Sequence, residues 1–200
     1  MNPRVTSDSP PASGPISAEA LFRAHAGFVA GFVRRLGVAR EEVDDVVQEV
    51  FLVAHRRGGF APSVARPTTW LAEIALRVVS THRRSERRRR VGPDEEALRA
   101  AVAPHGSPHE VAEQRAALER VERALAALDV DRRAVFILFE LEGEPCDAIA
   151  AGLGIPVGTV HSRLHAARKA FFAAHARLEK APPPRVRDLE HQVPARGGAT

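Results

Sequence analysis

A cluster of hydrogen-bond donors lies near the end of the chain, in the stretch that follows Gly154-Ile155-Pro156. Hydroxyl, imidazole and guanidinium groups of this kind can donate to DNA phosphates and to base edges in the major groove. At helical spacing they share one face: Thr159, His161, Ser162, Arg163, His165 and Arg168. This face is therefore a candidate DNA-binding surface.

The segments around this face have the pattern of a helix-turn-helix. A short helix is predicted from about Pro145 to Gly152, and Gly152 and Gly154 can supply the positive φ angles of a tight turn. Pro156 suits the first turn of a second helix. The stripe of that helix expected to be buried contains Val157, Val160, Leu164 and Ala167. A helical hairpin with a solvated face is the alternative, but the donor-rich front favours DNA binding.

A second basic cluster occupies residues 82–90, with the sequence HRRSERRRR. Six Arg against one Glu repel each other unless they meet a polyanion. The forked guanidinium of Arg suits phosphate, and only two basic residues of the chain are Lys. This run is therefore expected to bind a nucleic-acid backbone, and a basic linker is the alternative.

A polar ridge is expected on the helix predicted at about 40–57. Its valines and Phe51 face inward on a broad apolar face, whereas Asp45, Gln48 and Glu49 fall on the opposite side. Helical spacing alone favours a solvated surface for these three residues.

No constellation of catalytic residues competes with these surfaces. His161 and His165 are four residues apart and Cys146 could lie nearby, which superficially suggests a metal site. No second Cys or ligating acid pair supports one, and the chain has no phosphate-binding loop or dinucleotide motif. The sequence therefore predicts a protein that is not an enzyme, without metal, cofactor or small-molecule substrate.

The apolar spacing predicts an all-α fold of two small helical domains. The first, residues 17–90, contains helices from Ser17 to a stop at Gly37, from 40 to 57, and from 67 or 68 into the arginine run, with a loop at 59–67. The second, residues 109–180, contains a helix from 109, a cap at 129–131, a helix at 132–141 and the helix-turn-helix.

The composition changes abruptly at 91–108, which holds three Pro, two Gly and a DEE triplet. This segment is interpreted as a flexible linker between two domains that move independently. A docked pair that hides its DNA-binding faces is the alternative. The tails at 1–16 and 181–200 are rich in Pro and are expected to be disordered.

Composition and charge narrow the class of protein. The 200 residues carry a net charge of +4 and an isoelectric point near 10.4, which agrees with an acidic partner such as DNA without requiring one. No apolar run approaches the ~20 residues of a membrane span, and the first residues have no apolar core of a signal peptide. We expect a cytoplasmic protein without membrane insertion.

Three stretches together resemble the extracytoplasmic-function (ECF) sigma factors of bacterial RNA polymerase. DDVVQEVFLVAH at 44–55 and TTWLAEIALRVVSTHRR at 68–84 look like their region 2, and EGEPCDAIAAGLGIPVGTVHSRLHAARKAF at 142–171 resembles their region 4. The resemblance covers roughly 20–180. It implies a sigma factor that binds core RNA polymerase and promoter DNA, with an anti-sigma factor as a further partner, and that associates with the nucleoid through polymerase.

The resemblance also implies roles for particular residues. The residues implied to bind the polymerase clamp are Asp45, Gln48, Glu49 and Phe51. Those implied to bind the minus-ten element are Phe60, Arg66, Trp70, Arg77, Arg83, Arg84, Arg87 and Arg88, although Trp70 also has the spacing of a core residue. Those implied to bind the minus-35 element are Pro156, Gly158, Thr159, His161, Ser162, Arg163, His165 and Arg168.

The sequence departs from the family pattern at several positions. Leu76-Arg77 stands where Arg-Asn is frequent, Thr81 where Asp is frequent, and His161 where a basic residue is usual. Two other functions therefore stay open: a stand-alone helix-turn-helix regulator, and a degenerate sigma-like protein without initiation activity.

Overall fold

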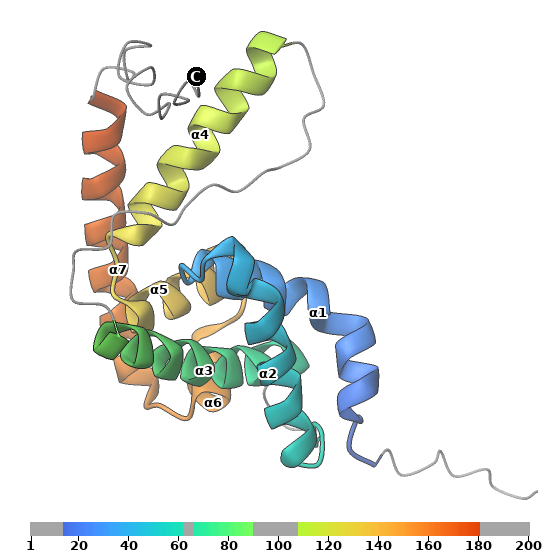
Figure 1. Cartoon of the computed structure of the whole chain (residues 1–200). Helices are drawn as coiled ribbons and strands as arrows, with labels where there is room; N and C mark the ends of the chain where they lie inside the picture. Colours follow the sequence, from blue (N-terminus) through green and yellow to red (C-terminus); the bar gives the residue numbers. More distant parts are fainter. Residues whose placement is uncertain (1–13, 62–65, 90–107, 181–200) are drawn as a thin grey trace, which may run out of the picture.

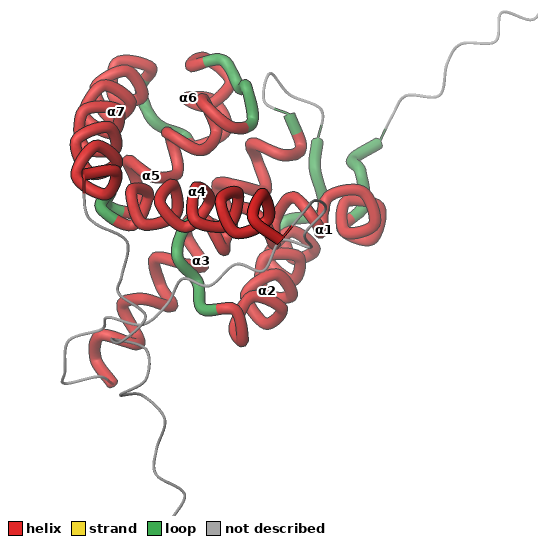
Figure 2. Tube along the Cα trace, turned by 90° about the horizontal axis from the view of Figure 1, so that it is seen from above, coloured by secondary structure: helices red, strands yellow, loops and turns green. Residues whose placement is uncertain are grey.

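The computed structural model describes residues 14–61, 66–89 and 108–180, without the side chains of 85–89 and 108–112. The predicted all-α fold is confirmed. The described part contains no strand (Figure 2). Among the described residues, Ile16 and Phe60 form an isolated antiparallel bridge.

The first half is a bundle of three helices (Figure 1). Its elements are α1 (Ala18–Arg35), the short 3-10 helix η1 (Arg40–Glu42), α2 (Val43–Arg56) and α3 (Pro67–Arg89). Each of the three α-helices contacts the other two. The predicted cap is present, because the Ser17 hydroxyl accepts a hydrogen bond of 3.2 Å from the Ala20 amide. Gly37 follows α1 at a φ of 92°, which explains why the helix stops there.

The second half contains α4 (Pro108–Ala126), α5 (Val130–Phe136), the π-helical turn η2 (Ile137–Leu141), α6 (Cys146–Leu153) and α7 (Val157–Lys180). Helices α4, α5 and α6 all contact α7. Asp129 caps α5 as expected, its carboxylate accepting 2.9 Å from the Arg132 amide. The N-terminal part of α4 diverges from α7 (Figure 1), so Leu118 and Val121, which are apolar by spacing, are only half-buried.

The helix-turn-helix differs from the expectation at two positions. Gly154 supplies the left-handed cap of α6, with φ 65° and ψ 36°, but Gly152 is helical and has no positive φ. Gly152 instead permits close packing, because a Cβ there would lie 2.3 Å from Cγ2 of Thr69. Val157 begins α7 and is 40% exposed, so the buried stripe starts at Val160.

The two halves pack against each other in this structure, which is the docked arrangement given above as the alternative to independently moving domains. Helix α3 contacts α5 and α6, and buried residues of both halves form one continuous apolar cluster. Helical spacing shows which face of a helix is apolar but not which element covers it, so the docking could not be derived from spacing. The predicted linker and tails fall largely outside the described residues.

The left-handed turn gives a prediction about stability. Replacing Gly154 by Ala should destabilise the protein by about 1–2 kcal/mol, because a Cβ is disfavoured at this φ even though nothing crowds it. The midpoint of urea unfolding, followed by far-UV circular dichroism, measures the change. Gly158→Ala is the matched control, since Gly158 is helical and its Cβ would also enter open space. Equal midpoints for the two variants would contradict the role of the turn.

Candidate nucleic-acid and polymerase interface

The donor face predicted on the second helix of the helix-turn-helix is accessible on α7. His161, Ser162, His165 and Arg168 are exposed, and Thr159 and Arg163 are half-buried. Pro156 and Gly158 at the start of the helix are exposed as well. The Pro156 carbonyl accepts from the amides of Thr159 and Val160 at 2.9 and 3.2 Å, which anchors the first turn. The Ser162 hydroxyl donates to the Thr159 carbonyl at 3.0 Å, so it is already engaged within the helix.

The guanidinium groups of this face are held by acidic residues of neighbouring elements. Arg163 donates to Asp131 of α5 at 3.0 Å, and Arg168 donates to Glu140 of η2 at 2.6 Å. The Arg168 guanidinium also lies 5.1 Å from the centre of the Phe139 ring. These contacts fix where both positive charges stand. Sequence reasoning missed these three contacts, because the partners lie 28 or more residues away. Asp131 was predicted only as part of a cap, and Phe139 and Glu140 only as residues of a helix.

The aromatic residues assigned to the minus-ten surface lie in a corner of the first half. Phe60 is only 5% exposed, and its ring centre lies 5.7 Å from that of the half-buried Trp70. The Phe60 backbone exchanges two hydrogen bonds with Ile16, of 2.8 and 2.9 Å. Phe60 is therefore held inside this corner, and the side chain of Trp70 is the more accessible of the two.

The basic residues assigned to the same surface have different surroundings. Arg66, Arg77 and Arg84 are exposed, and Arg77 forms an ion pair with Glu73. Arg83 donates to the carbonyl of Leu36 at the end of α1, so part of its donor capacity is used internally. The side chains of Arg87 and Arg88 lie outside the described residues.

Arg133 is a buried cation that sequence reasoning did not single out. It is 4% exposed, and its guanidinium donates to the carbonyls of Leu36, Ala126 and Leu128 at 2.8–2.9 Å. Burial lowers the pKa of Arg133 from its ordinary value to about 10; the nearby charge of Arg83 lowers it further, and Asp129 opposes the shift. The group therefore stays charged at neutral pH.

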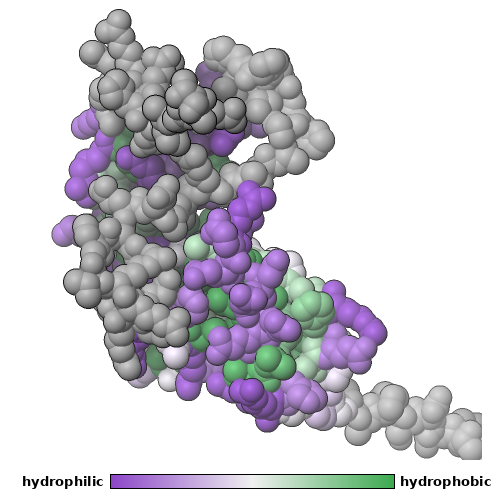
Figure 3. Space-filling view, in the orientation of Figure 1, coloured by the Kyte–Doolittle hydropathy of each residue, from purple (hydrophilic) through white to green (hydrophobic). Residues whose placement is uncertain are grey.

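The polar ridge on α2 is exposed, as helical spacing predicted. Asp45, Gln48 and Glu49 are accessible, whereas Phe51 is only 7% exposed and meets the ring of Phe22 edge-on, with 5.0 Å between ring centres. Phe51 can therefore support the ridge but offers little surface of its own. Figure 3 shows apolar surface among polar residues on this half of the molecule.

Two apolar side chains near this helix were not predicted as surface residues. Phe22 on α1 and Leu52 on α2 are each 48% exposed. The contact between Phe22 and Phe51 places Phe22 beside α2, so the exposed face combines carboxylates with apolar groups. The signal in the sequence is that both apolar residues lie beside, rather than on, the buried stripe of their helix.

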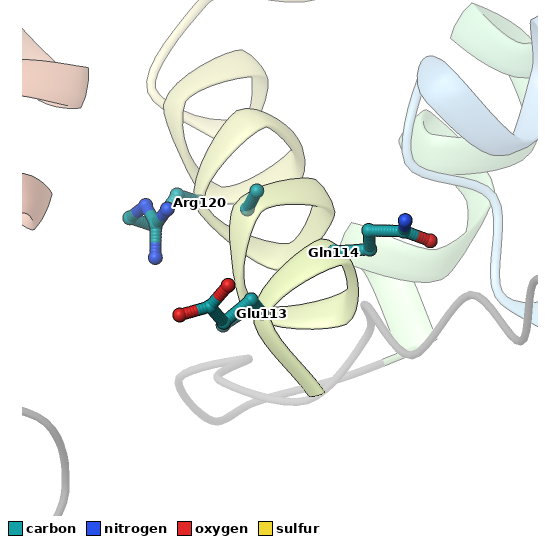
Figure 4. A pocket seen from close by; sticks show the side chains of 5 residues that line it. Glu113, Gln114 and Arg120 are labelled. Carbon is teal, nitrogen blue, oxygen red and sulfur yellow. The ribbon is translucent and has the colours of Figure 1, made fainter. Parts of the chain in front are cut away.

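Other kinds of site have little support in the described residues. No group of three or more His, Cys, Asp or Glu side chains among them could hold a metal ion. A hollow beside α4 is lined by residues of that helix alone. Glu113 and Arg120 point to one side of the helix and Gln114 to the other, so these three side chains do not converge on one point (Figure 4). Among all the described residues, no helix has the length and apolar character that a membrane span requires.

Family models match both halves of the chain. The model of sigma-70 region 2 matches residues 21–89, and that of sigma-70 region 4 matches residues 118–171. The ECF RNA polymerase sigma factor SigL of Mycobacterium tuberculosis is 35% identical over 167 residues, which cover 80% of this chain and 92% of SigL. The ECF sigma-E factor of Escherichia coli is 32% identical over 150 residues, 72% of this chain and 78% of that protein.

Solved structures support the same fold. The sigma factor RpoE from Bartonella quintana, in complex with the anti-sigma factor NepR, has a TM-score of 0.63 at 21% identity and covers 78% of this chain and 94% of its own. CnrH, in complex with the cytosolic domain of CnrY, has a TM-score of 0.50 at 26% identity and covers 78% of this chain and 85% of its own. With these matches over both halves, the chain belongs to the ECF sigma factors of the sigma-70 family.

Proposed function

We propose that this protein binds core RNA polymerase as its promoter-specificity subunit and directs promoter recognition and opening. The observation that carries the proposal is the presence of both sigma regions in one chain, in the family's order and over 92% of the length of SigL. A stand-alone regulator that uses only the helix-turn-helix would have no need of the first half. The protein would act in the bacterial cytoplasm, at the nucleoid.

The first half binds the polymerase clamp and the minus-ten strand, and the second half binds the minus-35 element. The ridge Asp45, Gln48 and Glu49 on α2 binds the polymerase clamp, where polar side chains give register and selectivity. Arg66, directly before α3, and Trp70, in the first turn of α3, bind the minus-ten strand. The exposed face of α7 reads the minus-35 element in the major groove. These roles are supported by exposure and by the family resemblance of the residues concerned.

An anti-sigma factor is a further partner that we propose. One similar solved structure is a sigma factor in complex with the anti-sigma factor NepR, and another, CnrH, is in complex with the cytosolic domain of CnrY. The mixed surface around Phe22, Leu52 and the α2 ridge would suit a competitor of polymerase, because it combines exposed apolar area with negative charge.

The test of the function is transcription in vitro with purified core polymerase on a pool of genomic DNA. Specific start sites that appear only when this protein is added are the expected result. Their sequences would also reveal the promoter. Absence of specific starts, together with intact binding to core polymerase, would favour a degenerate sigma-like protein.

The first residue-level prediction concerns the α2 ridge. Asp45→Arg combined with Gln48→Ala should weaken binding to core polymerase while the helical signal and melting temperature stay close to those of the wild type. Both side chains are exposed, so little packing is lost. Glu179→Arg is the control with the same change of charge, because Glu179 is exposed on α7. Unchanged retention of core polymerase by the double variant in a pull-down would remove α2 from the interface.

The second concerns base reading by α7. Each ring nitrogen of His161 can make one hydrogen bond, whereas Arg can hold guanine with two. His161→Arg should therefore change the preferred base in the minus-35 element and tighten binding by about 1–3 kcal/mol. Selection from a library with a randomised minus-35 element measures both effects. Ala173→Arg, exposed at the other end of α7, controls for added charge. An unchanged selected motif would mean that residue 161 does not face the bases.

The third concerns Arg168, which is held by Glu140 and Phe139 in a fixed position. A fixed guanidinium at this point suits a phosphate contact. Arg168→Ala should weaken binding to all sequences by a similar factor and lower the slope of log K against log salt by about 0.9. A changed base preference with an unchanged slope would argue for direct reading instead.

A further inference from the structure

The second half contacts the first at two helix ends: the C-terminal end of α1 and the N-terminal end of α3. Arg133 of α5 donates to the Leu36 carbonyl at the C-terminal end of α1, at 2.9 Å. Glu144, in the turn between η2 and α6, lies at the N-terminal end of α3. A helix attracts cations at its carbonyl end and anions at its amide end. Each of these two charges therefore stands at the helix end that favours it.

Glu144 is held among groups of the first half. Its Oε1 accepts from the Thr68 hydroxyl at 3.3 Å and lies 3.5 Å from Nη1 of Arg66. The residue is only 3% exposed, and Oε2 has no hydrogen-bond partner among the described residues. A buried carboxylate requires charged or hydrogen-bonding partners. Glu144 finds two of them in the other half of the chain.

The same groups of the first half are suited to a phosphate. A guanidinium, a hydroxyl and the amide end of a long helix are the groups with which proteins bind DNA phosphates. Arg66 belongs to the segment to which the minus-ten strand is assigned above. Glu144 and a DNA phosphate therefore carry the same charge toward the same donors.

We propose that the structure is a closed state, in which Glu144 occupies the position of a backbone phosphate of single-stranded promoter DNA. The minus-ten strand and Glu144 then compete for Arg66 and Thr68, and the chain must open at the contact between α3 and α6 before the strand binds. This inference rests on the proposed function, because the competing ligand is promoter DNA. Its immediate consequence is that free protein binds single strands more weakly than its open form does.

The first test removes the charge of Glu144 and keeps its shape. Glu144→Gln should bind a fluorescein-labelled, short, mixed-sequence single-stranded DNA about tenfold more tightly than the wild type in an anisotropy titration, if the open form of the wild type is a minor species. Small-angle X-ray scattering of the full chain should show a larger radius of gyration. Glu119→Gln is the matched control, because Glu119 is exposed on α4 and pairs only with Arg115 in the described structure.

The second test opens the same contact without any change of charge. Gly152→Ala places a Cβ 2.3 Å from Cγ2 of Thr69, so α3 and α6 must separate, while Ala suits the interior of α6. We expect the same gain in binding to the single strand and the same expansion. Gly27→Ala is the control, since Gly27 lies within α1 and its Cβ would enter open space. Circular dichroism confirms that each variant keeps its helices.

The outcomes separate this inference from the proposed function. A variant that expands but binds the single strand like the wild type would overturn the competition, and so would wild-type dimensions for both variants. Loss of the gain when Arg66→Ala is added to Glu144→Gln would support it. Transcription by the wild-type holoenzyme is measured independently. If the holoenzyme produces no specific transcripts while the variants bind the single strand more tightly, the promoter function is overturned. The competition between Glu144 and the single strand is then still supported.

Discussion

The buried guanidinium of Arg133 is the interaction on which the arrangement of the second half depends. It reaches the end of α4 through Ala126, the turn before α5 through Leu128, and the end of α1 through Leu36. Moving such a cation out of water costs several kcal/mol, and only good partners offset that cost. Three carbonyl oxygens accept from its two terminal nitrogens, so the position of α5 is set relative to both α4 and the first half.

The position of α5 in turn determines the face of α7. Asp131 on α5 holds Arg163, and Glu140 on the following η2 turn holds Arg168. Since α5 and α6 both contact α7, the same segments that position the basic side chains also carry the helix-turn-helix onto α3. The DNA-reading surface and the contact between the halves are therefore mechanically connected through one short stretch of chain.

Some residues act on the backbone close to them in the sequence, whereas others act through residues far away along the chain. Ser17, Asp129 and Gly154 act on the backbone within a few residues of themselves, so their roles could be predicted from sequence. The exposure of the α2 ridge and of His161 also follows from helical spacing. Gly152 is different, because its purpose depends on Thr69, more than eighty residues earlier.

The same distinction applies to the candidate site. Helical spacing already places Phe51 on the inward face of its helix, and it is 7% exposed. Phe60 was assigned to a surface by family resemblance alone, which gives a position along the chain but not the depth of a side chain. The burial of the two rings depends on Phe22 in one case and on Trp70 and Ile16 in the other. The sequence did not single out Glu144, because a Glu in a turn between Gly143 and Pro145 is ordinarily a solvated residue. Only the packing of the two halves removes it from water.

The bridge between Ile16 and Phe60 has a consequence for how this chain can vary over evolution. Both of its hydrogen bonds join backbone atoms, so almost any amino acid at position 16 can form them, and only Pro lacks the donor. Position 59 is far less tolerant, because Gly59 has a φ of 85° and a Cβ there would lie 2.2 Å from the Ile16 carbonyl oxygen. We therefore expect homologous proteins to vary freely at position 16, provided that they keep Gly59, which the backbone of residue 16 contacts.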